Sequence, residues 1–268
     1  MDGTLAQVIA LVAYGNAWLK SADVNAPKLF DANTTFQYVD AVKFVRYASK
    51  EQETGIVAAE STADWLTWLR ETEAQRLWNI AFAWQRQDCA EYALSGLANS
   101  IPRAIQVDLP SGYELWYPFW QTGGPAGKIW RVEYRGLKFD HSCAMPLVDL
   151  GQVKAYLRQA LEEAEAFALL PEANSTGWAE WFTKAQALLE SEAPIPPFHP
   201  DMLPAQGYSL EARRVLAAAT QANVFGGMGS WNDLGFSDPE LQSRYQSVTA
   251  RLYEIVKIAF VMASNSFA

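Results

Sequence analysis

The segment from residue 104 to 140 constrains the fold more than any other part of the chain. It holds three extended runs, "AIQVDL", "YELWYPFW" and "KIWRVEYRGLKFD", separated by "PSG" and "QTGGPAG". Runs rich in β-branched and aromatic residues, divided by glycine and proline, are typical of strands joined by tight turns. The segment therefore predicts an antiparallel meander, whose apolar faces must be buried under other elements.

The last two runs of this meander differ in which residue types form their two faces. The faces of the third run are Trp130, Val132 and Tyr134 on one side and Arg131, Glu133 and Arg135 on the other. That alternation is typical of a strand with one face in water. The second run is apolar on both faces, with Tyr113, Leu115, Tyr117 and Phe119 on one and Trp116, Pro118 and Trp120 on the other. Either helices cover both faces, or one face is an aromatic patch for a partner, a small ligand or a carbohydrate.

The N-terminal part of the chain mixes helix and strand signals. Residues 5–20 predict a short amphipathic helix, whereas 34–47 favour a strand, with helix as the alternative for the second half. Ser61 with Asp64 indicates a helix start, and residues 62–95 then follow without glycine or proline. We expect helix through that stretch, with a break within 70–76.

After Asp149 the helical period returns. One apolar stripe is formed by Val153, Leu157, Leu161 and Ala164. A second helix is expected at about 177–191. Residues 193–207 then contain five prolines, which predicts an extended, semi-rigid connection.

The last helix has the clearest pattern. Ser237 and Glu240 predict a capping box, with Pro239 in the first turn. Its apolar face is formed by Leu241, Tyr245, Val248, Leu252, Ile255 and Ala259. Together these patterns predict an α+β fold, a mostly helical single domain over 1–268. A small antiparallel sheet, from about 34–48 and 104–140, is packed by N- and C-terminal helices, and the connection at 193–207 leads to a C-terminal helical pair at 208–266.

The charge of the chain restricts its partners. Thirty acidic residues against 21 basic ones give a formal net charge of −9, and residues 141–207 hold nine acids and three bases. Such a surface repels phosphate backbones, so we expect no nucleic-acid partner, whereas a basic protein would be attracted.

The composition also indicates a cellular compartment. Two cysteines form no disulfide framework, and the N-terminal segment lacks the basic region and cleavage site of a signal peptide. The apolar C-terminal run is short and contains Lys257, so it cannot span a bilayer. We expect a soluble, cytoplasmic protein without membrane contact.

Cys89 and His141 suggest one catalytic alternative. A cysteine on a helix with a histidine after a following strand is the layout of papain-like cysteine hydrolases. Helical spacing with Trp78, Phe82 and Tyr92 instead predicts that Cys89 is buried in mid-helix, where its thiol stays protonated. Cys143 lies beside His141, but two ligands do not hold zinc. We therefore expect no catalytic set, no metal and no cofactor.

Other polar residues have structural explanations. Asp108, Glu114 and Glu133 could meet across the meander, but we expect cross-strand pairing with Arg103, Arg131 or Arg135 instead. His199, the second of two histidines, lies within the proline-rich connection and is expected to be exposed.

The glycine-rich stretch 224–236, "VFGGMGSWNDLGF", allows two interpretations. In the first, Gly226 or Gly227 adopts a left-handed conformation that caps the helix near 209–223, and Trp231 folds back onto the core. In the second, Trp231, Asn232 and Asp233 form a surface contact of the kind found at interface hot spots.

These observations favour a non-enzymatic protein that binds another protein. Its most concrete form is a bacterial immunity protein that neutralises a basic toxin or effector by covering the active site. The alternatives are the cysteine hydrolase and a domain that binds a small ligand or carbohydrate on the aromatic meander. The residues predicted to contact the partner are Trp116, Trp120, Glu162, Glu163, Glu165, Trp231, Asn232 and Asp233.

Overall fold

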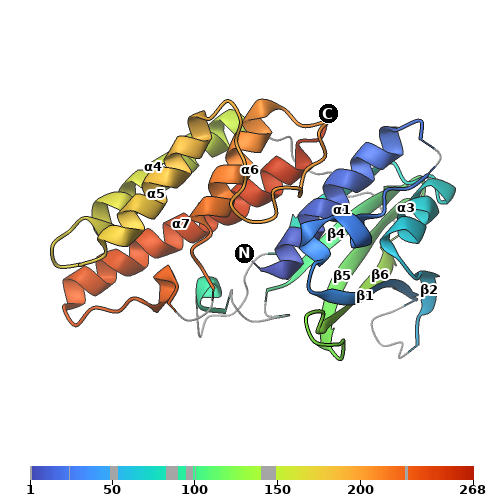
Figure 1. Cartoon of the computed structure of the whole chain (residues 1–268), viewed down its shortest axis with the longest axis horizontal. Helices are drawn as coiled ribbons and strands as arrows, with labels where there is room; N and C mark the ends of the chain where they lie inside the picture. The colour runs from blue at the N-terminus through green and yellow to red at the C-terminus, as the bar shows by residue number, and fades with distance from the viewer. Residues whose placement is uncertain are drawn as a thin grey trace.

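A helical bundle and a sheet lie side by side in one α+β domain (Figure 1). The computed structural model describes residues 2–23, 25–48, 54–82, 90–94, 99, 101–139, 149–226 and 229–268. The predicted fold class is confirmed, because N- and C-terminal helices both contact the sheet.

The sheet has six strands in the order β2-β1-β6-β5-β4-β3. They are β1 (Val39–Tyr47), β2 (Ile56–Ala59), β3 (Arg76–Ala81), β4 (Arg103–Leu109), β5 (Gly112–Thr122) and β6 (Trp130–Phe139). The meander β4–β6 is antiparallel, as predicted. The expectation of a wholly antiparallel sheet is wrong, because β1 pairs with β6 in parallel. Parallel neighbours need a long crossover, and the chain between β1 and β6 supplies it.

One face of the sheet is covered by α1 (Gly3–Lys20) and α3 (Thr62–Glu71), which lie in front of it in Figure 1. Between α1 and β1 run the short α2 (Leu29–Ala32) and the 3₁₀ turn η1 (Thr34–Phe36). The predicted helix at 5–20 is present, but it is buried nearly all round instead of amphipathic. Bundle side chains pack on one side of α1 and sheet side chains on the other, so no face is left for water.

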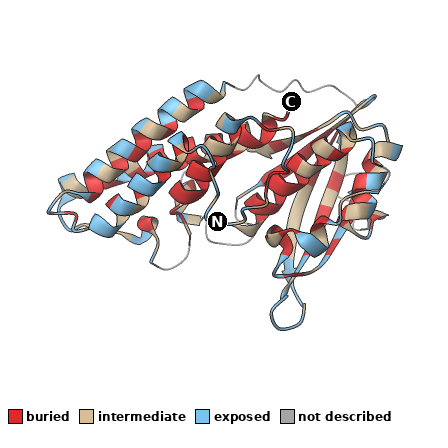
Figure 2. Cartoon of the chain, turned by 45° about the horizontal axis from the view of Figure 1, so that its top comes forward, coloured by how far each residue is buried: buried red, intermediate tan, exposed pale blue. Residues whose placement is uncertain are grey.

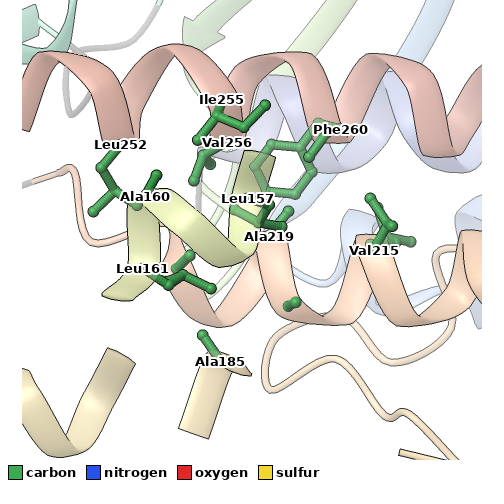
Figure 3. Close-up of a cluster of buried hydrophobic side chains, with 14 of the residues drawn as sticks. Leu157, Ala160, Leu161, Ala185, Val215, Ala219, Leu252, Ile255, Val256 and Phe260 are labelled. Atoms are coloured by element: carbon green, nitrogen blue, oxygen red, sulfur yellow. The ribbon is translucent and has the colours of Figure 1, made fainter. Parts of the chain in front are cut away.

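The bundle consists of α4 (Leu150–Ala168), α5 (Thr176–Glu190), α6 (Leu210–Ala222) and α7 (Pro239–Asn265). Buried residues line the facing sides of these helices in Figure 2, and Figure 3 shows side chains from all four meeting in one cluster. The stripe predicted on α4 is buried. On α7, the predicted face is buried except at Leu241 and Val248, which are partly exposed.

The stretch after Ser61 shows where helical spacing misleads. Ser61 caps α3 by accepting a hydrogen bond from the Asp64 amide at 3.1 Å, and the helix ends within the predicted break. The continuation is the strand β3 and not a helix, because residues 76–81 pair along their whole length with β4. The tertiary pairing overrides the local pattern.

Two asparagine side chains bind the backbone of β3 along the edge that faces away from β4. The Asn16 amide of α1 bonds to both the N–H and the C=O of Leu77, each at 2.9 Å. The Asn265 amide at the end of α7 bonds likewise to Asn79, with distances of 2.7 Å to its N–H and 3.0 Å to its C=O. These bonds hold α1 and α7 against the same strand.

The proline-rich connection is fastened to η1. Asp201 accepts a hydrogen bond from the Thr34 amide at 2.8 Å and another from the Thr34 hydroxyl. His199 Nδ1 lies 3.1 Å from that hydroxyl. The expectation that His199 is exposed is wrong, because its side chain is partly buried, and this burial lowers its pKa.

The cap of α7 lies one residue later than predicted. Asp238 is the N-cap and accepts a hydrogen bond from the Leu241 amide at 2.7 Å, while Pro239 begins the first turn as expected. The predicted box between Ser237 and Glu240 is therefore wrong. An aspartate at the N-cap also suits the positive end of the helix dipole.

Asp238→Ala should destabilise the protein by about 1 kcal/mol, because it leaves an N-terminal amide of α7 without its cap. Ser237→Ala is the matched control and should change stability by less than about 0.5 kcal/mol. Urea unfolding followed by circular dichroism measures both. Equal losses in the two variants would contradict the cap assignment.

Candidate functional site

The face of the sheet opposite α1 and α3, hereafter the outer face, combines aromatic rings with a charged cluster. Its side chains are assigned from the strand register, in which Tyr117 pairs with Arg135 and Phe119 with Glu133. The residues that define it are Lys43, Tyr47, Trp78, Phe82, Tyr113, Tyr117, Phe119, Glu133, Arg135, Leu137 and Phe139. This arrangement follows from strand alternation, which sends Trp116, Pro118 and Trp120 to the inner face.

The aromatic part of the outer face is made of stacked pairs. Phe82 and Tyr117 have ring centroids 5.7 Å apart, and Tyr113 and Phe139 stack at 5.0 Å. Tyr113 is only 8% exposed, whereas Tyr117, Phe119 and Phe139 keep part of their surface in water. Burial raises the pKa of Tyr117, so its hydroxyl stays protonated at neutral pH. The partly exposed rings run along β5 and β6.

Glu133 is the centre of the charged part. Its carboxylate accepts hydrogen bonds from Lys43 Nζ at 2.7 Å, Arg135 Nε at 2.8 Å and the Tyr47 hydroxyl at 3.0 Å. Partial burial acts to raise the pKa of Glu133, but these three donors outweigh it and leave the pKa lowered. The Arg135 guanidinium lies 4.2 Å from the centre of the Phe119 ring. The charged side chains of β1 and β6 therefore lie next to the partly exposed rings of the outer face.

The three carboxylates of the meander do not meet. Asp108 accepts from the Trp78 indole at 2.6 Å on the outer face. Glu114 is on the inner face, its side chain 1% exposed, with Arg46 Nη2 at 2.7 Å. Burial raises the pKa of Glu114, against the opposing charge of Arg46. Of the three arginines expected as cross-strand partners, Arg135 does pair with Glu133, but within one strand instead of across strands.

Two of the tryptophans predicted to contact a partner are buried, which corrects that prediction. Trp116 is 0% exposed under α3, with the Phe44 and Trp65 rings both 5.9 Å away. Trp231 is 0% exposed in the bundle core, and its indole donates to Thr249 Oγ1 at 2.9 Å. Fully buried rings have no surface to offer a partner. Trp120 is partly buried against Trp130, with ring centroids 5.7 Å apart.

The glycine-rich stretch is a packed corner, as the first interpretation had it. Asn232 Oδ1 accepts from the Gly226 amide at 3.1 Å, and Asp233 Oδ2 accepts from the Gly229 amide at 2.7 Å. Both side chains are used to hold the loop. Among the described glycines of this stretch, Gly229 is left-handed, with φ +84°, and Gly226 is not. Gly227 lies outside the described residues.

The predicted acidic residues on α4 have unequal roles. Glu163 is paired with Arg251 Nη1 at 2.6 Å. Glu165 accepts from the Thr183 hydroxyl at 2.8 Å and from Gln186 at 2.6 Å. Both therefore connect helices of the bundle. Glu162 is exposed, and nothing in the described ranges forms an ion pair with it.

The residues of the hydrolase alternative, Cys89 and His141, lie outside the described residues, as does Cys143. Among the residues that are described, no group of three or more histidine, cysteine, aspartate or glutamate side chains is arranged to hold a metal ion. In the same ranges, no helix has the length and apolar character needed to cross a membrane. Comparison with protein-family models, curated proteins and solved structures gives no match.

The sequence did not reveal that Lys43 and Tyr47 belong to this surface. Alternation along β1 places them on one face, but their neighbour Glu133 comes about ninety residues later in the chain. Only the parallel pairing of β1 with β6 brings them together.

Glu133 and Glu114 should affect the pH dependence of stability in opposite directions. The folded-state pKa of Glu133 is lowered, so its stabilising contribution is present above the ordinary value of 4.5 and is lost as pH falls through the lowered value. The folded-state pKa of Glu114 is raised, so its contribution is present below 4.5 and is lost as pH rises through the raised value.

Urea unfolding between about pH 3 and pH 8 measures this for the wild type, Glu133→Gln and Glu114→Gln. The stability difference between wild type and Glu133→Gln should grow with pH, and that for Glu114→Gln should shrink. Glu162→Gln, at an exposed site, should give a nearly flat difference. Parallel curves for Glu133→Gln and Glu114→Gln would refute the assignment.

Proposed function

We propose that this chain is a non-enzymatic binding protein that contacts a protein partner through the outer face. The observation that carries the proposal is the contact of Arg135 with Phe119, beside Tyr47, on a partly exposed sheet surface. Arginine and aromatic residues are the types enriched where protein interfaces concentrate their binding energy.

The arrangement of these side chains suits recognition. The rings are fixed on paired strands and stacked on one another, and Arg135 is held by Glu133 at 2.8 Å. Side chains that are ordered before binding lose little conformational entropy when a partner covers them. A carbohydrate platform is less favoured, since Tyr113, which stacks on Phe139, is largely closed to solvent.

The most concrete form of the proposal is a bacterial immunity protein that covers the active site of a basic toxin or effector. The net charge of −9 supports a basic partner. Exposed acids such as Glu162 would speed the encounter, while the rings of the outer face would slow dissociation. Glu163 and Glu165 contribute to the general charge while holding the bundle together.

Phe119→Ala and Arg135→Ala should each weaken partner binding by at least about tenfold. Each variant removes one of the two side chains in the contact between Arg135 and the Phe119 ring, which the partner would cover. The measurement is titration calorimetry of the purified chain against the purified product of the adjacent reading frame. Tyr156→Ala is the matched control, since Tyr156 is 54% exposed on α4 of the bundle. Unaltered affinity in both outer-face variants, or no binding by the wild type, would count against this proposal.

Glu162→Lys should slow association with that partner several-fold at low salt and leave dissociation nearly unchanged, because an exposed charge acts mainly on the encounter. Surface plasmon resonance at low and high ionic strength separates the two rates, and the difference should vanish at high salt. An association rate equal to that of the wild type at low salt would remove the steering role from α4.

A further inference from the structure

A second polar cluster, only part of which is buried, lies where the bundle meets the start of α1 and β4. It surrounds a cavity whose polar lining consists of Asp2, Arg103, Asn223, Tyr253 and Lys257. The remaining wall is apolar and comes from α1, α7 and the loops beside them. None of these residues belongs to the outer face, so the cavity is separate from the proposed partner surface.

Arg103 is the unusual member of this cluster. It is 6% exposed, and its Nε and Nη1 atoms have no hydrogen-bond acceptor in the described part of the chain. Burial lowers the pKa of Arg103, yet a guanidinium remains charged in proteins. A buried cation with unfilled donors is costly, because neither its charge nor its N–H groups are compensated by water.

The neighbouring carboxylates are already engaged. Asp2 Oδ1 accepts from the Thr4 amide at 3.0 Å and caps α1. Glu91 accepts from the Tyr253 hydroxyl at 3.0 Å and from Lys257 Nζ at 2.8 Å. Both carboxylates act on Arg103 through their charge, but the open donors still lack an acceptor.

We propose that this cavity binds a small monovalent anion, a chloride ion or the end of a carboxylate, as an acceptor for Arg103. Its interior space is about 20 Å³, which is room for one water-sized group. A water molecule could also accept from these donors, but an anion forms charge-assisted hydrogen bonds with the guanidinium, which are about twice as strong as bonds between neutral groups. The tetrahedral head of methanesulfonate is bulkier than a chloride ion or a planar carboxylate end, so methanesulfonate is the reference anion.

Thermal unfolding with chloride or acetate replacing methanesulfonate at constant ionic strength tests this proposal. Either anion should raise the wild-type Tm saturably, by about 3–5 °C at ten times its dissociation constant. Arg103→Gln should abolish the shift. Arg251→Gln is the matched control, since Arg251 is an exposed arginine paired with Glu163, and it should keep the full shift.

Equal shifts in the wild type and Arg103→Gln, or no saturable shift in the wild type, would overturn the proposal. If Arg103→Gln does not fold, the ³⁵Cl linewidth of the wild type decides instead. Excess broadening that acetate displaces, and that Ile101→Phe at the cavity wall removes, supports the site. Absence of excess broadening, or broadening that persists in Ile101→Phe, rejects it.

Discussion

The burial of α1 between two cores is the constraint on which the rest of the structure depends. Leu5 and Ile9 pack into the bundle, while Val8 and Leu11 pack against the sheet. A helix that is buried on all sides must provide a hydrogen-bond partner for every polar side chain that it carries. Gln7 does so by donating to the Thr35 carbonyl at 3.1 Å and accepting from the Tyr134 hydroxyl at 3.1 Å. Bundle and sheet therefore share one helix, and neither core is complete without it.

The parts of the fold that could be predicted are those coded locally. The meander was readable because turn residues and alternation lie within one short stretch, and the α4 stripe because helical spacing is local. The strand β3 and the parallel pairing of β1 were not readable, since both depend on partners far along the chain. The cap of α7 was predicted one residue too early, because Ser237 and Asp238 are equally good capping types.

The candidate surface shows a similar limit. Alternation separated the two faces of β5 correctly, but nothing local indicated which face α1 and α3 would cover. Trp116 was therefore indistinguishable from Phe119 until the packing was known. The largest ring was the one that the core needed, and the smaller one remained partly in water beside Arg135. Residue type alone thus gave a poor guide to which aromatic side chain a partner can reach.

The asparagine amides on β3 have a consequence for assembly. Asn16 and Asn265 imitate the peptide groups of a neighbouring strand, so the backbone of Leu77 and Asn79 has no vacancy for one. Edge strands are where sheets from separate molecules fuse into fibres or exchange segments. At these two residues the edge of β3 is closed to a further strand, which leaves β2, at the other end of the sheet, as the more open edge for intermolecular pairing.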